Sequence, residues 1–535
     1  MARAAGVARV IALIVMVSIS LSAAGSVPTI VDAAERGDLE AVRSLLRTKT
    51  DVNKPSADGT TALHWAVRGN NVELIELLVK AGANVKAVNR YGIAPLTFAA
   101  ENGSARAVDA LIKAGADPNS ATAAGEPVLM TAARTGNVDT LQRLIAAGAN
   151  VNAREPWFGE NAIIWAAGEN HAAAVRILAA AGADVNARST ALTPPVLEFP
   201  RSGGPNSPFP RGGWTPLMYA ARQGAIDAAR ALVELKADLN AVALPQTDVP
   251  LKPEDIEAAA RGIGTTALVF AIINTHYDLA AMLVERGADP NIADVAGETA
   301  LYAAVDMNSL QWVQGRPAPI LRDRLDGVDL AKQLLAKGAN PNVRLKKAPL
   351  KRHHDAGSTM NFNEGTTPLM RAARTNDVPV MRALLDAGAD PFLTLPDGTT
   401  TLMIAAGQGY GGLRGEGIRI VVPTEEGAVA AVSLLLERGV DVNAVSATGN
   451  TALHAAVGRG DSVVRLLAGR GAALVANNAG FTPLDLALGA GGRGGRGGPV
   501  RDSAAALLRQ LYPGARPSDP PVPRPRTALA PAGVQ

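Results

Sequence analysis

The stretch TALHWAV at residues 61–67 places a histidine inside an apolar run, and related stretches recur along the whole chain. They begin at residues 94 (APLTFAA), 127 (PVLMTAA), 161 (NAIIWAA), 215 (TPLMYAA), 266 (TALVFAI), 299 (TALYAAV), 367 (TPLMRAA), 400 (TTLMIAA), 451 (TALHAAV) and 482 (TPLDLAL). The steps from 61 to 94 and from 94 to 127 are each 33 residues long. A fixed period of this length indicates an array of stacked repeats rather than separate globular domains.

A second signature follows the first in constant phase. It reads GANV at 82, GADP at 115, GANV at 148, GADV at 182, GADP at 287, GANP at 338, GADP at 388 and GVDV at 439. Within one unit, Thr61 is a residue type that caps a helix, and the apolar residues of VELIELLV (72–79) fall on one face of a second helix. Each unit therefore predicts two helices, a glycine that ends the second, and an Asp/Asn-rich turn.

The two signatures together resemble the ankyrin repeat, and the resemblance covers about twelve copies between Pro28 and Tyr512. It implies an all-α solenoid over residues 25–512, built of helix-turn-helix repeats that are joined by β-turn fingers. Longer steps between copies predict insertions near 189–213, 243–264, 308–327, 344–365 and 409–427. Residues 513–535 are rich in proline and lack hydrophobic periodicity, so a disordered tail is expected there.

The histidine of the opening stretch is predicted to be structural. Its slot holds Met130, Ile164 and Asp485 in other copies, and a catalytic role would not tolerate such variation. The ankyrin resemblance implies that His64 and His454 bond the backbone of a turn.

Composition narrows the function. The 535 residues include no cysteine, which excludes disulfides, thiolate metal sites and a cysteine nucleophile. Lys and Arg number 52 against 49 Asp and Glu, a formal charge of +3, so nothing global favours a nucleic acid partner. The sequence has no GK[ST] phosphate loop, HExxH or GxSxG. We therefore expect a non-enzymatic protein without a cofactor.

Residues 1–24 have the pattern of a secretory signal. Arg3 and Arg9 precede an apolar run from Val10 to Leu21, and small residues follow up to Ala24. These 12 apolar residues are fewer than the ~20 that a membrane span requires, so cleavage near Ala24 is favoured over a membrane anchor. The mature chain is predicted to be periplasmic or secreted, without a stable membrane span. In this it resembles exported bacterial ankyrin proteins.

The resemblance also implies where a protein partner would bind, at the finger tips and the ends of the first helices. Matching positions hold Arg90, Tyr91, Trp157, Phe158 and Trp214 at fingers, and Arg68, Arg134, Arg222 and Arg374 at helix ends. Aromatic and arginine side chains are favoured at binding hot spots. The sequence therefore predicts a protein-binding scaffold of unknown partner, with Trp157 and Phe158 as its principal contact pair.

The sequence leaves two alternatives open. The segment KRHHD (351–355) places His353 and His354 near several cations, which raises a metal- or anion-binding protein or enzyme with its site around 341–365. Cationic loops also raise a weak contact with an anionic surface.

Overall fold

The computed structural model describes residues 29–190, 212–244, 263–309, 323–346, 364–408, 424–490 and 499–518. These residues contain 24 helices and no strand longer than an isolated bridge. They form two compact units. The first comprises the described residues up to Pro156 together with Asn161–Ala166 and Ile177–Ala183, and the second comprises the other described residues. The expected all-α repeat fold is confirmed.

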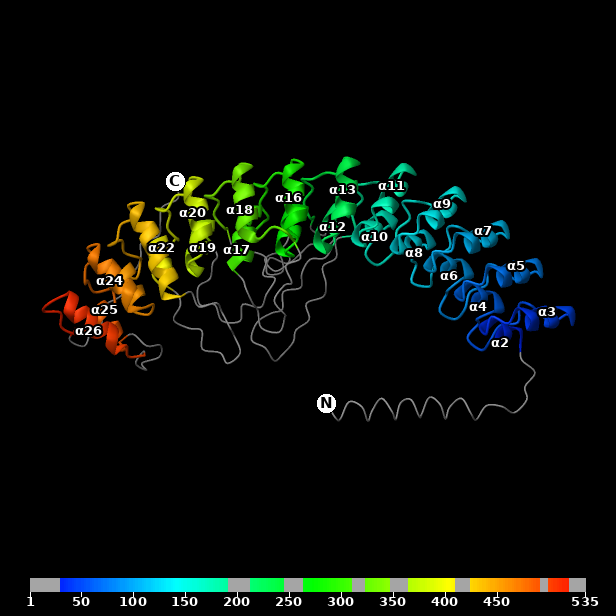
Figure 1. Cartoon of the computed structure of the whole chain (residues 1–535), viewed down its shortest axis with the longest axis horizontal. Coiled ribbons are helices and arrows are strands. Elements are labelled where there is room, and N and C mark those ends of the chain that lie inside the picture. Colours follow the sequence, from blue (N-terminus) through cyan, green and yellow to red (C-terminus); the bar gives the residue numbers. More distant parts are fainter. Residues whose placement is uncertain are drawn as a thin grey trace, which may run out of the picture. The chain divides into compact units, whose positions relative to one another are not determined.

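The helices alternate between two kinds, which pair into twelve repeats (Figure 1). The first helix of each pair, called inner here, is α2 (Ile30–Glu35), α4 (Ala62–Arg68), α6 (Pro95–Glu101), α8 (Val128–Thr135), α10 (Ala162–Gly168), α12 (Pro216–Gln223), α15 (Ala267–Ile273), α17 (Ala300–Ser309), α19 (Pro368–Thr375), α21 (Thr401–Ala405), α23 (Ala452–Ala456) and α25 (Pro483–Ala487). The second, called outer, is α3 (Leu39–Arg47), α5 (Val72–Lys80), α7 (Ala105–Lys113), α9 (Val138–Ala146), α11 (Ala172–Ala180), α13 (Ile226–Glu234), α16 (Tyr277–Glu285), α18 (Gly327–Ala336), α20 (Val378–Asp386), α22 (Glu425–Glu437), α24 (Asp461–Gly469) and α26 (Asp502–Leu511).

Local sequence sets where these helices begin and end. The hydroxyl of Thr215 accepts the Met218 backbone N–H at 3.4 Å, and Pro216 follows with its φ already helical. The side chain of Asn71 caps the outer helix of repeat 2 by accepting the Leu74 N–H at 3.1 Å. That helix is followed by Gly82 at φ 89°, a conformation that glycine adopts without strain.

Within each unit, inner helices pack against inner helices and outer against outer. In the first unit α2, α4, α6 and α8 follow one another in one layer and α3, α5, α7 and α9 in the other. Buried alanines such as Ala66, Ala99 and Ala132 let the inner helices approach closely, while leucines such as Leu74 and Leu78 fill the space beneath the outer helices. The small number of large aromatic side chains is thus consistent with a thin, continuous core.

Three of the expected insertions leave the array at fingers. In an uninterrupted finger, Asn89 N–H donates to Ile93 O and Gly92 N–H to Asn89 O. The same pair of bonds closes residues 189 and 213–214, residues 243 and 264–265, and residues 345 and 365–366. The interiors of all five insertions lie outside the described residues. Two of the insertions fall between an inner and an outer helix, α17 and α18 or α21 and α22.

The C-terminal segment expected as a tail is in part ordered. Ser518 donates its backbone N–H and its hydroxyl to the Asp485 carboxylate, at 2.8 and 2.7 Å. Ser518 is thus attached to the inner helix of the last repeat, and the rest of the expected tail and the expected signal segment lie outside the described residues.

Asparagines at the bases of the fingers join neighbouring repeats in a ladder. Asn119 donates its Nδ2–H to Gly148 O at 3.1 Å and accepts the Asn150 N–H at 2.7 Å. The Nδ2 bond recurs between Asn53 and Gly82, Asn152 and Gly182, Asn291 and Gly338, Asn342 and Gly388, and Asn443 and Gly471. The corresponding slot holds Lys86 in repeat 2 and Phe392 in repeat 9, which cannot make this pair of bonds.

Candidate functional site

The ends of the inner helices form a repeating contact, which we call the inner-face seam. Positions within a repeat, called slots below, are numbered from the first residue of the inner helix, so that Ala62 is the first residue of α4 and Arg68 the seventh. The seventh residue of one repeat lies beside the fourth residue of the next. The Arg68 guanidinium carbon lies 5.9 Å from the centre of the Phe98 ring, and that of Arg134 lies 5.7 Å from the Trp165 ring.

Arg68 has the most extensive aromatic contact in this seam. Its guanidinium lies 5.3 Å from the centre of the Trp65 ring of its own helix as well as above Phe98 of the next. Trp65 and Phe98 are half-buried, whereas Arg68 is exposed. Cation–π contact on two rings restricts the guanidinium, so a ligand that binds it loses little side-chain entropy.

His64 and His454 are buried and structural, as expected. His64 Nδ1 accepts the Thr61 N–H at 3.1 Å, and its Nε2 lies 3.0 Å from Ile93 O in the next finger. His454 repeats this pattern with Thr451 and with Phe481 O. Burial lowers the pKa of both imidazoles, which keeps them neutral. They link adjacent repeats and have no surface to offer a partner.

Finger 2 presents the predicted pair Arg90 and Tyr91. Tyr91 is 55% exposed, and the Arg90 guanidinium stacks 4.8 Å from the centre of its ring while donating to its hydroxyl at 2.6 Å. The backbone N–H of Arg90 donates to Asp58 O of the preceding finger, which anchors the pair. An ordered aromatic and a cation therefore lie together at this finger tip.

Trp157 and Phe158 lie at the finger tip of repeat 4 and belong to the second unit. They are 66% and 46% exposed, among the most exposed large apolar side chains of the described residues. The Phe158 carbonyl accepts the Thr190 N–H at 2.6 Å, which attaches the tip to the next finger. Their exposure leaves both rings accessible to a partner, and the contact role stays a prediction.

Trp214 does not lie at an exposed finger tip as the sequence predicts. It is only 6% exposed, because its ring packs 4.8 Å from the Phe270 ring and 5.5 Å from that of Tyr219. Arg222 is exposed and stacks 5.3 Å from the Trp214 ring centre. Trp214 is thus a support for Arg222 rather than a contact residue.

Arg374 is also misplaced by the sequence prediction, since it is only 8% exposed. In this part of the seam the fourth slot holds Arg371 instead of an aromatic residue, and Arg371 forms an ion pair with Asp306 in the seventh slot of the preceding repeat. Tyr302 is fully buried nearby, and burial raises the pKa of its phenol well above the usual range. The inner face at repeats 8 and 9 is therefore a packed polar cluster, which the repeat pattern did not signal.

The metal alternative rests on residues that the structure does not describe. His353 and His354 lie in the undescribed segment 347–363. Over the residues that are described, no three His, Asp or Glu side chains come together as a metal site. Nor is any helix there both long and apolar enough to cross a membrane.

Comparisons with known proteins agree with this architecture. Residues 30–122, 129–243, 324–414 and 420–495 match a family model described as ankyrin repeats (3 copies), and residues 268–314 match one described as ankyrin repeats (many copies). The putative ankyrin repeat protein L86 of Acanthamoeba polyphaga mimivirus is 28% identical over 144 residues, which are 26% of this chain and 22% of that protein.

Two animal proteins are similar over longer segments. The neurogenic locus Notch protein of Drosophila melanogaster is 29% identical over 202 residues, 37% of this chain and 6% of Notch. The B-cell lymphoma 3 protein homolog of Mus musculus is 29% identical over 196 residues, 36% of this chain and 33% of that protein. The aligned segments thus cover at most 33% of these three relatives. Because the family models match most of its length and its helices pair as such repeats do, the chain belongs to the ankyrin-repeat family.

Proposed function

We propose that this protein is a non-enzymatic scaffold that binds a protein partner through its inner face and finger tips. Ankyrin repeats in general mediate protein–protein interaction, and the family models match most of the chain. The scaffold contributes preorganisation, because side chains held by a packed array need not be ordered when the partner binds.

The observation that carries this proposal is the stacking of Arg68 on Trp65 and Phe98. The exposed Arg68 guanidinium lies against both rings and leaves N–H groups accessible to solvent. Such groups bind carboxylates in a bidentate manner, and the exposed rim of each ring adds apolar area. Tyr91 offers a comparable aromatic surface at finger 2.

The test is capture of the partner from the source cells under mild cross-linking, with single-site variants compared side by side. Arg68→Ala is expected to weaken capture of a partner by about tenfold, since a charged hydrogen-bond partner at an interface contributes roughly 1.5–3 kcal/mol. Trp157→Ala/Phe158→Ala tests the fingers of the second unit in the same way. The matched control is Arg106→Ala, which removes an exposed arginine from outer helix α7.

The proposed surface would be refuted if Arg68→Ala and Trp157→Ala/Phe158→Ala both captured a partner as well as the wild type does. Capture that Arg106→Ala reduces as much as Arg68→Ala would also contradict it, because Arg106 belongs to the outer layer. Loss with Trp157→Ala/Phe158→Ala alone would move the site to the second unit and away from Arg68.

We also propose export, with cleavage near Ala24, from the sequence pattern of residues 1–24. The mass of the protein recovered from fractionated cells tests it directly. Recovery from the periplasm or medium of a chain that is shorter by about 24 residues supports the proposal. An intact chain in the membrane fraction favours the anchor, and an intact chain in the cytoplasm refutes both.

A further inference from the structure

Repeat 6, like repeat 1, ends its outer helix with a lysine at positive φ in place of the usual glycine. Lys236 follows α13 at φ 66°, in the slot where most repeats place glycine. The glycines in this slot include Gly82, Gly115, Gly148, Gly182, Gly287, Gly338, Gly388, Gly439 and Gly471, all at positive φ. A Cβ built on the described glycines of this slot meets no atom within 4 Å, so glycine is favoured there by backbone conformation alone. A lysine in this conformation is strained, and such strain is a reason to look for function.

Each connection of the asparagine ladder, called a rung here, is closed when the asparagine makes both of its bonds to the next repeat. On both sides of repeat 6 the rung is open, because among the described residues the asparagine makes one of the two bonds. Asn240 accepts the Asp289 N–H at 2.9 Å, but within the described residues its Nδ2 makes no bond to Gly287 O. Asn186 likewise accepts the Asp238 N–H at 2.8 Å without donating to Lys236 O. The closed rung one repeat later, Asn291 to Gly338, measures 2.9 Å.

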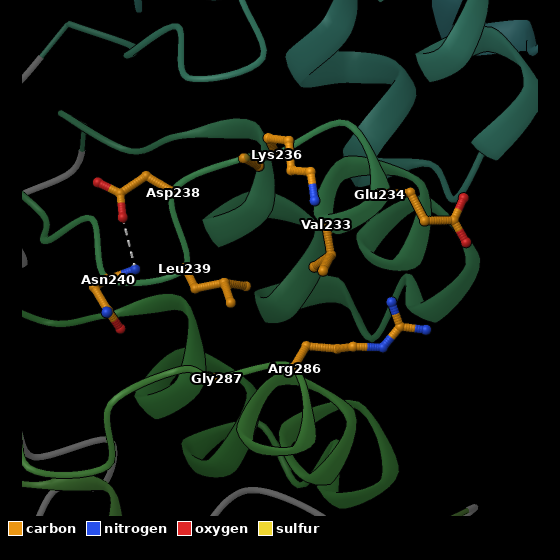
Figure 2. A pocket seen from close by; sticks show the side chains of 9 residues that line it. Val233, Glu234, Lys236, Asp238, Leu239, Asn240, Arg286 and Gly287 are labelled. Atoms are coloured by element: carbon orange, nitrogen blue, oxygen red, sulfur yellow. Dashed lines mark hydrogen bonds between the residues drawn. The ribbon is translucent and has the colours of Figure 1, made fainter.

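An opening on the outer side accompanies the open rung. Helices α13 and α16 are not among the closely packed outer neighbours, unlike α16 and α18. A cavity of about 630 Å³ lies here, with Val233 and Leu239 as apolar lining (Figure 2). Lys236 reaches it from repeat 6 and Arg286 from repeat 7, with Val233 between them (Figure 2). Lys236, Asn240 and Arg286 are exposed, so the cavity is open to solvent.

The carboxylates that line this cavity have polar partners, whereas its two cations have no carboxylate partner among the described residues. Glu234 forms an ion pair with Arg176 at 2.7 Å, and the Asp238 carboxylate accepts the Asn240 N–H at 2.9 Å. Across the described part of the chain, Lys236 and Arg286 have no carboxylate within ion-pair distance. The cavity therefore offers two cations, an amide donor and a carbonyl acceptor beside apolar side chains.

We infer that this cavity between repeats 6 and 7 binds the C-terminal carboxylate of a polypeptide that ends in aliphatic residues. The carboxylate would pair with Lys236 and Arg286, and the aliphatic side chain would cover Val233 and Leu239. The peptide backbone would supply the donor and acceptor that complete the open rung at Asn240 Nδ2 and Gly287 O. An inorganic anion would use the two cations but neither the rung nor the apolar lining.

This site is distinct from the proposed inner-face function. It lies at the ends of outer helices, whereas Arg68 and Tyr91 lie on the inner helices and fingers. Loss of peptide binding at the cavity would therefore leave the inner-face proposal standing, and the reverse is also true.

The experiment measures fluorescence polarisation of a labelled hexapeptide that ends in Ala-Leu-Leu with a free carboxylate, added to the full chain. Binding is expected, and the same peptide with an amidated C-terminus should bind about tenfold more weakly or worse because it lacks the charge. Arg286→Ala should reduce affinity by a similar factor. Lys337→Ala is the matched control, since it removes a cation from the slot of Arg286 one repeat later, beside a closed rung, and should change nothing.

A second pair of variants separates function from folding. Lys236→Gly should raise the denaturation midpoint because it removes the strained residue, and yet it should weaken peptide binding. Lys49→Gly makes the same change at the equivalent slot of repeat 1, where Lys49 has φ 59°, and should raise the midpoint without affecting binding.

Three results would overturn the inference. The amidated peptide could bind as tightly as the free acid, or Lys236→Gly could bind as tightly as the wild type. Inorganic phosphate could compete at concentrations equal to those of the peptide, which would reduce the site to a general anion patch. No detectable binding of the hexapeptide would refute it as well.

Discussion

The inner-face seam has the same geometry between repeats 2 and 3 as between repeats 8 and 9, but the residues in its slots give it opposite characters. Between repeats 2 and 3, Arg68 lies on Phe98 and remains exposed. Between repeats 8 and 9, Asp306 pairs with Arg371, and Arg374 is buried close by. Equivalent scaffold positions thus hold an exposed, stacked cation in one pair of repeats and an ion pair in another, and we propose recognition for the first and cohesion for the second.

The largest expected effect comes from breaking the ion pair. Asp306→Ala removes this carboxylate from the buried Arg371 guanidinium and should destabilise the protein by about 3 kcal/mol. Chemical denaturation measures the change, and Asp306→Asn should recover a part of it through a neutral hydrogen bond. A cost below that of a typical surface substitution would show that the cluster does not hold repeats 8 and 9 together.

The shared geometry of the two buried histidines predicts a pH dependence common to both units. Burial lowers their pKa values from 6.5. Above pH 6.5 both imidazoles are therefore neutral in the folded and in the unfolded protein, and the folded protein has the full stability that these neutral histidines allow. As the pH falls below 6.5 the unfolded chain takes up protons first, and stability is lost towards the lowered folded-state pKa. Unfolding free energies measured between pH 7.5 and 5 test this. The slope should shrink in His64→Leu/His454→Leu, and an unchanged slope would assign it to other groups.

A smaller effect should follow from completing the asparagine ladder. Phe392→Asn would supply the two bonds that other rungs make and remove an exposed phenyl ring, stabilising the second unit by about 1 kcal/mol. Lys86→Asn is the same repair in the first unit. Phe392→Ser serves as the control, because it removes the ring without spanning the gap, and an equal gain from it would deny a role for the ladder.

The smallest change in stability is expected at the exposed seam. Arg68→Ala should cost only about 0.5–1 kcal/mol, the usual range for an exposed cation–π contact. Thermal unfolding of the variant beside Asp306→Ala gives the direct contrast between the two regions. Should the two variants lose equal stability, Arg68 would be a structural residue and its assignment to recognition would lose its basis.

Much of the fold could be predicted from particular residues. The capping threonine, the proline after it, the apolar face of residues 72–79 and the glycine at 82 each act within a few residues, so periodicity alone located the helix pairs. His64 and His454 were assigned correctly because the variation of their slot excluded chemistry. Tyr91, Trp157 and Phe158 are exposed at fingers, and their role as partner contacts stays a prediction.

Other features depended on contacts between repeats, which the spacing of one repeat does not encode. Trp214 precedes its helix as a finger residue should, but Phe270 of the next repeat covers it. Arg374 occupies the same slot as Arg68, but Arg371 and Asp306 change its surroundings. The open rung at Asn240 was not predicted either, since Asn240 and Gly287 are the residue types that form a closed rung at Asn291 and Gly338.

The sequence by itself therefore determined the repeat, its helices and their order, because short-range capping and amphipathic spacing specify each unit. Only the tertiary structure decided which side chains of equivalent slots are exposed, stacked, paired or left beside a cavity. The physical reason is that each slot is completed by the neighbouring repeat, and neighbours about 30 to 70 residues away differ from one copy to the next.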